Sequence, residues 1–254
     1  MKKVWLKDLR DILPAVIRMA VAFAVLELVI LLAFAIKNAG LVSTGLYMFV
    51  FALALSALYL LYAAGRAFLG NLRSETYYRE LAGQGVPRAR AVVFKIAYYI
   101  IAMWAFIAAY AAALILDVSI FKSSYPEEWA PLAEKLNAEG TLSFSASSVA
   151  ATVFEYMTAA AVLVVLVFFA VIISFTFAMR NRFTGVGSVL LYLFFFGAFM
   201  KLYKVTIKGR SGVSLNLVAG AMQTVLAAVL TALVVLILEK KTFPTEIKKR
   251  PGEV

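Results

Sequence analysis

Residues 19–36 read MAVAFAVLELVILLAFAI, an apolar run with one charged residue, Glu27, near its middle. A helix that crosses the hydrocarbon core of a bilayer needs about 20 apolar residues. This run is long enough, and it exceeds the apolar core of a signal peptide, which has about 7 to 15 residues. Five further apolar runs occupy about residues 46–64, 91–116, 156–179, 186–203 and 215–238. The sequence therefore predicts an all-α integral membrane protein with about six transmembrane helices, in a single domain that covers residues 1–254.

The composition of the whole chain agrees with a membrane location. Hydrophobic residues make up 64% of the chain and charged residues 15%, whereas soluble domains are about 45 to 50% apolar and about 25% charged. His and Cys are both absent, which excludes disulfides, thiolate nucleophiles, imidazole catalysis and Cys/His zinc sites, so we expect no metal site. The net charge of +11 does not indicate nucleic-acid binding, because membrane proteins concentrate Lys and Arg in cytoplasmic loops.

The positions of the basic residues predict the orientation. With both termini in the cytoplasm, most of the 25 Lys and Arg residues lie on the cytoplasmic side, as the positive-inside rule requires. We therefore expect a multi-pass protein of the cell (plasma) membrane with both termini cytoplasmic. One loop departs from the rule, because the basic stretch 201–210 would be external. Its basic residues are Lys201, Lys204, Lys208 and Arg210.

Two polar segments have helical spacing outside the predicted spans. Residues 1–13 alternate apolar and charged positions with a helical period, which predicts an interfacial helix that lies flat on the membrane. Residues 117–148 form a long external loop, in which Ser124 and Glu127 have the spacing of a capping box. Three apolar residues on one helical face follow, namely Trp129, Leu132 and Leu136. A short interfacial helix is expected there too.

The connection between the second and third spans is the most informative polar segment. Residues 71–95 read NLRSETYYRELAGQGVPRARAVVFK. Ser74 is a good N-cap, and Gly83 or Gly85 can end the helix. The segment therefore predicts a short amphipathic helix at about 74–84, which either rests on lipid headgroups or contacts another protein through aromatic and basic side chains. Its apolar positions are Tyr77, Tyr78 and Leu81.

At these residues the sequence resembles the membrane-spanning permease subunits of ABC transporters of the ABC-2 type. The family pattern is an acidic residue, an Arg, then Gly-x-x-Arg and a Lys seven residues later. The matching positions are Arg79, Gly85, Arg88 and Lys95, with Glu75 close to the acidic position. The chain departs from the family at the Gly-Thr pair that usually precedes the coupling helix, where it has Thr76-Tyr77 or an adjacent pair.

The resemblance implies six spans, an interfacial helix before the first, and a coupling helix that docks on a separate ATP-binding cassette subunit. That subunit would bind the ATP and Mg, and a second permease copy or a related permease would complete the transport path. The chain has no G-x-x-x-x-G-K-[ST] loop, so it is expected to be a transport subunit without an ATPase site, not an enzyme. The residues expected to contact the ATPase are Glu75, Tyr77, Tyr78, Arg79, Leu81, Gly85 and Arg88.

Because the spans offer mainly aliphatic and aromatic lining, we expect export of an amphipathic or hydrophobic substrate, either a peptide or a lipid-like molecule. Glu27 is costly within a span and has three interpretations: a hydrogen bond to another helix, a lining of the translocation path, or a proton relay. Glu155 is expected near the external interface in a solvated or capping role. Two alternatives remain, an ATP-independent secondary transporter or channel that uses Glu27, and a membrane enzyme or scaffold.

Overall fold

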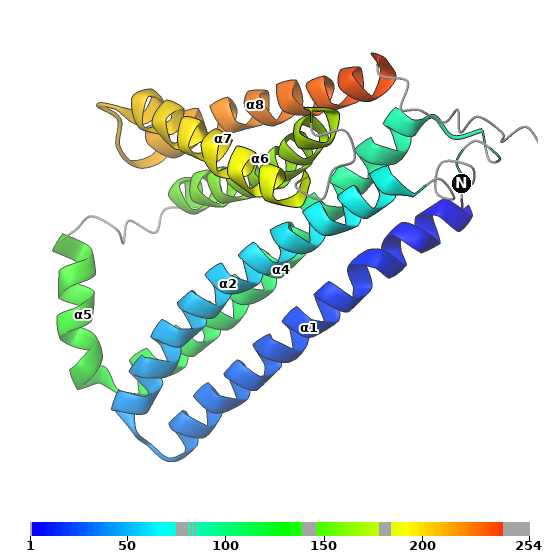
Figure 1. Cartoon of the computed structure of the whole chain (residues 1–254). Helices are drawn as coiled ribbons and strands as arrows, with labels where there is room; N and C mark the ends of the chain where they lie inside the picture. Colours follow the sequence, from blue (N-terminus) through cyan, green and yellow to red (C-terminus); the bar gives the residue numbers. More distant parts are fainter. Residues whose placement is uncertain are drawn as a thin grey trace, which may run out of the picture.

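The computed structural model describes residues 2–74, 81, 83, 85–138, 146–177 and 184–240. Every secondary-structure element within these residues is an α-helix (Figure 1). The helices are α1 (Lys2–Ala35), α2 (Ala39–Arg73), α4 (Arg88–Ser124), α5 (Pro126–Ala138), α6 (Ala146–Phe177), α7 (Thr184–Ile207) and α8 (Gly212–Lys240). The fold is therefore all-helical in the part that the structure describes.

Six of these helices, all except α5, are long and apolar enough to cross a membrane. The predicted number of spans is confirmed, and each predicted run coincides with one helix, but the helices extend beyond the runs. Helix α2 has 35 residues, which corresponds to about 50 Å at 1.5 Å per residue, whereas the hydrocarbon core is about 30 Å thick. Hydropathy marks the part of a helix that suits lipid, while the hydrogen-bonded backbone continues into the polar region.

The helices form two groups that meet at α6. Helices α1, α2 and α4 run side by side, and α6, α7 and α8 form a second group (Figure 1). Helix α6 packs against α8, α7, α2 and α4, and 72% of its most apolar window is buried, compared with 11 to 22% in the other five spans. Its buried residues include Val162, Phe168 and Ile172. Helix α6 is therefore the centre of the core.

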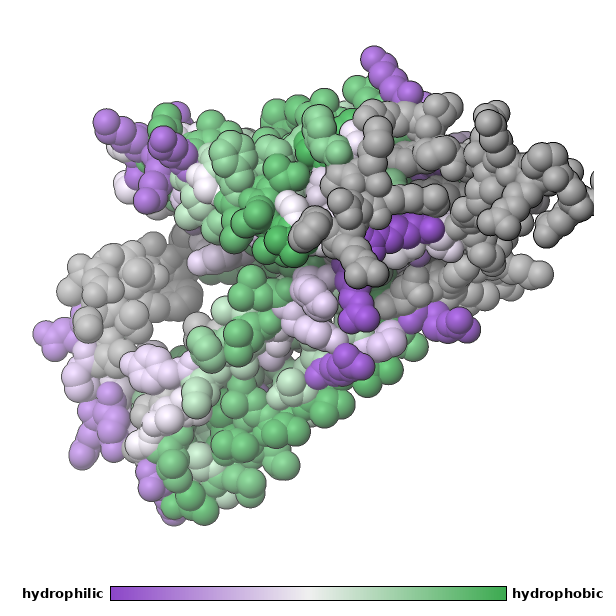
Figure 2. All heavy atoms as spheres, in the orientation of Figure 1, coloured by the Kyte–Doolittle hydropathy of each residue, from purple (hydrophilic) through white to green (hydrophobic). Residues whose placement is uncertain are grey.

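The other spans leave large apolar side chains uncovered, as a lipid-facing surface requires. Figure 2 shows hydrophobic surface along the length of α1, with hydrophilic residues at α5 and at the turn between α7 and α8. Phe194 and Val205 on α7 are 69% and 72% exposed. The start of α1, the α2–α4 connection and the end of α8 all lie toward one end of the molecule (Figure 1). Both described chain ends therefore share one side.

Of the two short helices predicted in residues 1–13 and 117–148, the structure has one, α5, whereas residues 2–13 are part of α1. Helix α1 runs without interruption from Lys2 past Pro14 into the first span, so a separate interfacial helix over residues 1–13 is not confirmed. Its apolar positions are in phase with those of the span, and no loop residue separates the two. In the connection between the third and fourth spans, the predicted short helix is present as α5. Trp129 packs against the ends of α1, α2 and α4, so this helix is held by protein contacts.

Candidate functional site

The α2–α4 connection carries the predicted coupling residues. Leu81, Gly85 and Arg88 lie within the described structure, whereas the predicted positions Glu75, Tyr77, Tyr78 and Arg79 lie outside the described residues. The N–H of Ser74 donates to the carbonyl of Asn71 at 3.1 Å, which closes α2. The backbone of Ser74 is extended, the conformation that an N-cap residue adopts.

Gly85 ends a helical segment in the way that its sequence position predicts. It has a φ of +63°, a left-handed conformation that glycine adopts without steric cost. The N–H of Val86 donates to the carbonyl of Leu81 at 3.0 Å, and both side chains pack together with Ala91. This is the 6→1 hydrogen bond and hydrophobic contact of a Schellman motif. Of the two glycines that could end the helix, the structure selects Gly85, since Gly83 is still helical.

We expect alanine at Gly85 to introduce backbone strain, and alanine at Gly83 to change only the helix propensity. An added Cβ meets no atom within 4 Å at either Gly83 or Gly85. Gly85→Ala must place a Cβ in the left-handed region, which costs about 1 to 2 kcal/mol. Gly83→Ala should instead be neutral or stabilise the helix by up to about 1 kcal/mol. Hydrogen exchange of the Val86 amide measures the difference, and equal protection in both variants would contradict the motif.

Two positions of the family pattern, Arg88 and Lys95, meet Leu81 at the end of the helix bundle. Leu81, Arg88 and Lys95 line one small cavity together with residues of α2 and α8. Those neighbours are Phe68, Asn71, Leu72 and Leu238, with Val92 from α4. Leu81 and Lys95 are each only 1% exposed. The connection is therefore anchored against three helices at once.

Glu27 lies far along α1 from this connection, and it faces a second acid. It is near enough to Asp117 on α4 for the two carboxylates to repel each other. Asp117 is 1% exposed. Both of its oxygens, and Oε2 of Glu27, are buried without a hydrogen-bond partner among the described residues. The interhelical hydrogen bond that the sequence suggests for Glu27 is therefore not formed by Oε2.

Asp117 was assigned to the external loop because the apolar run ends at residue 116. The structure corrects this, since α4 continues to Ser124. Tyr110 precedes Asp117 by two helical turns, and its hydroxyl is also buried without a partner among the described residues. The periodicity of buried positions at Tyr110, Ala113 and Asp117 is the signal that sequence reading could have used.

A polar ladder joins the helices of the second group. Thr152, Glu155 and Thr158 recur every three residues on α6, and each contacts α7 or α8 through a hydrogen bond. The bonds are Asn216 Nδ2 to Thr152 Oγ1 (2.7 Å), Tyr203 Oη to Glu155 Oε1 (2.5 Å) and Thr158 Oγ1 to Gln223 Oε1 (2.6 Å). Glu155 is therefore bound to another helix, not solvated or capping as expected, because α7 brings Tyr203 to it.

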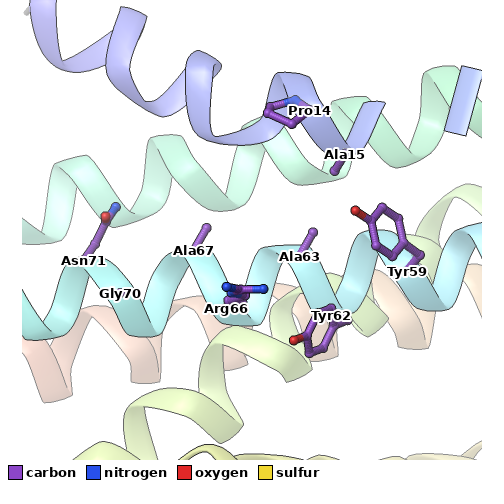
Figure 3. A pocket seen from close by; sticks show the side chains of 9 residues that line it. All are labelled: Pro14, Ala15, Tyr59, Tyr62, Ala63, Arg66, Ala67, Gly70 and Asn71. Carbon is purple, nitrogen blue, oxygen red and sulfur yellow. The ribbon is translucent and has the colours of Figure 1, made fainter. Parts of the chain in front are cut away.

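Two cavities meet on α2, and neither was visible in the sequence. The first has a volume of about 420 Å³ and lies between α1 and α2, lined by Pro14, Ala15, Tyr59, Tyr62, Ala63, Arg66, Ala67, Gly70 and Asn71 (Figure 3). The second, of about 440 Å³, lies between α2, α6 and α7. Tyr62 and Arg66 line both cavities.

The comparisons with known proteins add no relative. No family model, no curated protein and no solved structure matches this chain. By length and composition, six helices can span a membrane, which gives the chain the character of a multi-pass membrane protein. Within the described residues, no group of three or more acidic side chains could hold a metal ion.

Proposed function

We propose that this chain is the membrane-spanning subunit of an ATP-driven exporter, similar to the ABC-2 permeases. It would act with a separate ATP-binding cassette subunit and a second permease copy or a related permease. The observation that carries the proposal is the anchored α2–α4 connection. Leu81, which precedes the family's Gly-x-x-Arg pattern, and Arg88, the Arg of that pattern, line one cavity with residues of α2, α4 and α8.

This anchoring supports a mechanical role for the connection. Leu81 is almost fully buried, and it packs on Ala91 of α4 with Val86. The Schellman bond fixes the short segment between Leu81 and the start of α4. A force applied to the connection by an ATPase would therefore reach the helix ends and would not be absorbed by a loose loop. In the proposed cycle, nucleotide-driven closure tilts α1, α2 and α7 and opens a path outward.

The surface of the described spans fits an amphipathic or hydrophobic substrate, such as a peptide or a lipid-like molecule. Many large apolar side chains on α1, α2 and α7 are exposed. A cavity of about 440 Å³ on this surface lies within the size range of small-molecule sites, about 300 to 1,000 Å³.

Co-purification tests the proposal most directly. The chain is expressed with the cassette ATPase encoded beside it, and complex formation and ATP turnover are measured. We expect Arg88→Glu, and likewise Glu75→Lys and Arg79→Glu, to lower turnover in the complex about tenfold or more, since charged interface pairs are worth about 1.5 kcal/mol or more. Arg10→Glu is the matched control, because Arg10 is exposed on α1 and outside the connection. Full binding and turnover in the Arg88, Glu75 and Arg79 variants would refute the proposal.

The two neighbouring acids, half-buried Glu27 and buried Asp117, favour a second candidate, an ATP-independent secondary transporter or channel. Unpaired acids inside a membrane bundle commonly mark ion or proton pathways. In this candidate, purified protein in vesicles would move substrate or protons without any ATPase, and Glu27→Gln would abolish the movement. Transport that requires the ATPase and persists in Glu27→Gln would exclude it.

A further inference from the structure

Arg66 lines both a partly polar cavity and a mainly apolar cavity. In Figure 3, Tyr59 and Asn71 point toward the α1 side of α2, whereas Tyr62 points away from α1. The cavity on the α1 side is the one lined by Tyr59, Arg66 and Asn71. The cavity on the other side has a mainly aliphatic lining from α2, α6 and α7. Arg66 thus borders one cavity with a mixed polar and apolar lining and one with a mainly apolar lining.

We propose that these two cavities, which share Tyr62 and Arg66 in their walls, together bind an anionic membrane phospholipid. Its phosphate headgroup would occupy the α1–α2 cavity beside Arg66, and one acyl chain would lie in the groove between α2, α6 and α7. The site is independent of the proposed coupling to an ATPase, because every residue in it belongs to this chain.

The α1–α2 cavity offers hydrogen-bond donors and positive charge. Arg66 has no hydrogen bond or ion pair with any other described residue, so its five N–H donors are available for a phosphate. Nδ2 of Asn71 is buried without a partner among the described residues. Arg18 on α1 does not line the cavity, but it donates to the hydroxyl of Tyr59 at 2.9 Å, so a second guanidinium lies next to a residue of the cavity wall. No Asp or Glu lines the cavity among the described residues.

The groove on the other side fits an acyl chain. Leu61, Val167 and Val171 are buried and form its floor. Leu58 and Val189 at its rim are 58% and 55% exposed, so the groove opens sideways on the surface that faces lipid. A chain could therefore enter from the bilayer without crossing the protein. An acyl chain gains no hydrophobic free energy when it moves from the bilayer into this groove, because both are apolar. The headgroup must therefore supply the selectivity between lipids.

The depth of Arg66 also suits a headgroup. It precedes the end of α2 at Arg73 by seven residues, or about 10 Å along the helix. In membrane proteins, Tyr is enriched where the bilayer passes from hydrocarbon to headgroups, and Lys and Arg are enriched on the cytoplasmic side of that boundary. An arginine that merely extends its charge to water would attract any anion nearby. A specific lipid site instead binds one headgroup more tightly than another, and its affinity depends on the acyl-chain groove.

Native mass spectrometry of the purified full chain tests the proposal, with phosphatidylglycerol and phosphatidylcholine as probes. We expect phosphatidylglycerol to bind more tightly than phosphatidylcholine, and Arg66→Gln to weaken only phosphatidylglycerol, by about fivefold, as expected for one basic residue near a lipid surface. Arg66→Lys keeps the charge without the planar fork and should lose part of the affinity. Arg90→Gln is the matched control, because Arg90 is exposed at the same end of the bundle over the ring of Phe94.

A second arm separates a lipid from a free anion. Val189→Trp fills the groove from its exposed rim, so it should weaken phosphatidylglycerol and leave the fold intact, which the melting temperature checks. Inorganic phosphate should compete poorly with the lipid. Equal losses in Arg66→Gln and Arg90→Gln would overturn the site in favour of general surface charge. Phosphate that binds as tightly as phosphatidylglycerol, or a Val189→Trp variant with full lipid affinity, would overturn the assignment to a lipid.

Discussion

Asp117→Asn is expected to stabilise the protein, with an increase of about 1 to 3 kcal/mol in the free energy of unfolding. A charged carboxylate within a span costs about 2.5 to 3.5 kcal/mol on insertion scales. Asp117 has neither a hydrogen-bond partner among the described residues nor a counter-charge, and Glu27 repels it. Asparagine keeps the shape and removes the charge. Thermal and chemical unfolding in detergent or nanodiscs measures the change.

The repulsion between Glu27 and Asp117 can be tested separately with a double variant. Glu27→Gln should also stabilise, and the double variant should gain less than the sum of the two single variants, because either change removes the same repulsion. Glu128→Gln on α5 is the control, since Glu128 is exposed and its loss should leave stability within about 0.5 kcal/mol. A destabilised Asp117→Asn variant, or strictly additive effects, would show that the acids do not repel each other in the folded protein.

Gly220→Leu is expected to destabilise the protein by about 1 to 3 kcal/mol, as overpacking at a close helix contact does. Gly220 is buried on α8, where a Cβ would overlap the ring of Phe154 on α6. Glycine at this position therefore allows the two helices to approach closely. Unfolding by heat or denaturant measures the loss of stability.

Gly197→Leu on α7 is the matched control for this substitution. Gly197 is also a helical glycine, but it is exposed and a Cβ there would meet no atom within 4 Å. Leucine should therefore be tolerated or favoured by lipid and by its higher helix propensity. Combining Gly220→Leu with Phe154→Ala should recover part of the stability, because the smaller side chain removes the overlap. If Gly220→Leu and Gly197→Leu behave alike, the close contact of α6 and α8 is not required.

The number and approximate position of the spans could be predicted because apolar runs report directly on lipid contact. The helix ends could not, since the backbone remains helical where side chains become polar. Asp117 shows the consequence: it follows the apolar run, and yet it is buried within α4. The first 13 residues show the same effect at the start of α1, where no separate helix forms.

Two features of the candidate site could be predicted because each depends only on residues close together in the sequence. A glycine followed by a proline-led helix indicates a helix end, and the structure places that end at Gly85. Glu27 could be singled out because a charge inside a span is rare. The approach of Asp117 to Glu27 could not be predicted, because it depends on how α1 and α4 are rotated against each other. The cavities beside Arg66 depend in the same way on the spacing between helices.

The central position of α6 has a consequence for biogenesis. A chain enters the membrane in the order of its synthesis, so α1, α2 and α4 are inserted before the helix on which two of them pack. Until α6 arrives, the faces of α2 and α4 that it will cover remain open to lipid or to the insertion machinery. Release of a truncated chain before residue 146 would therefore leave a three-helix intermediate without its core. The fourth span to be made is the one that joins the first three to the last two.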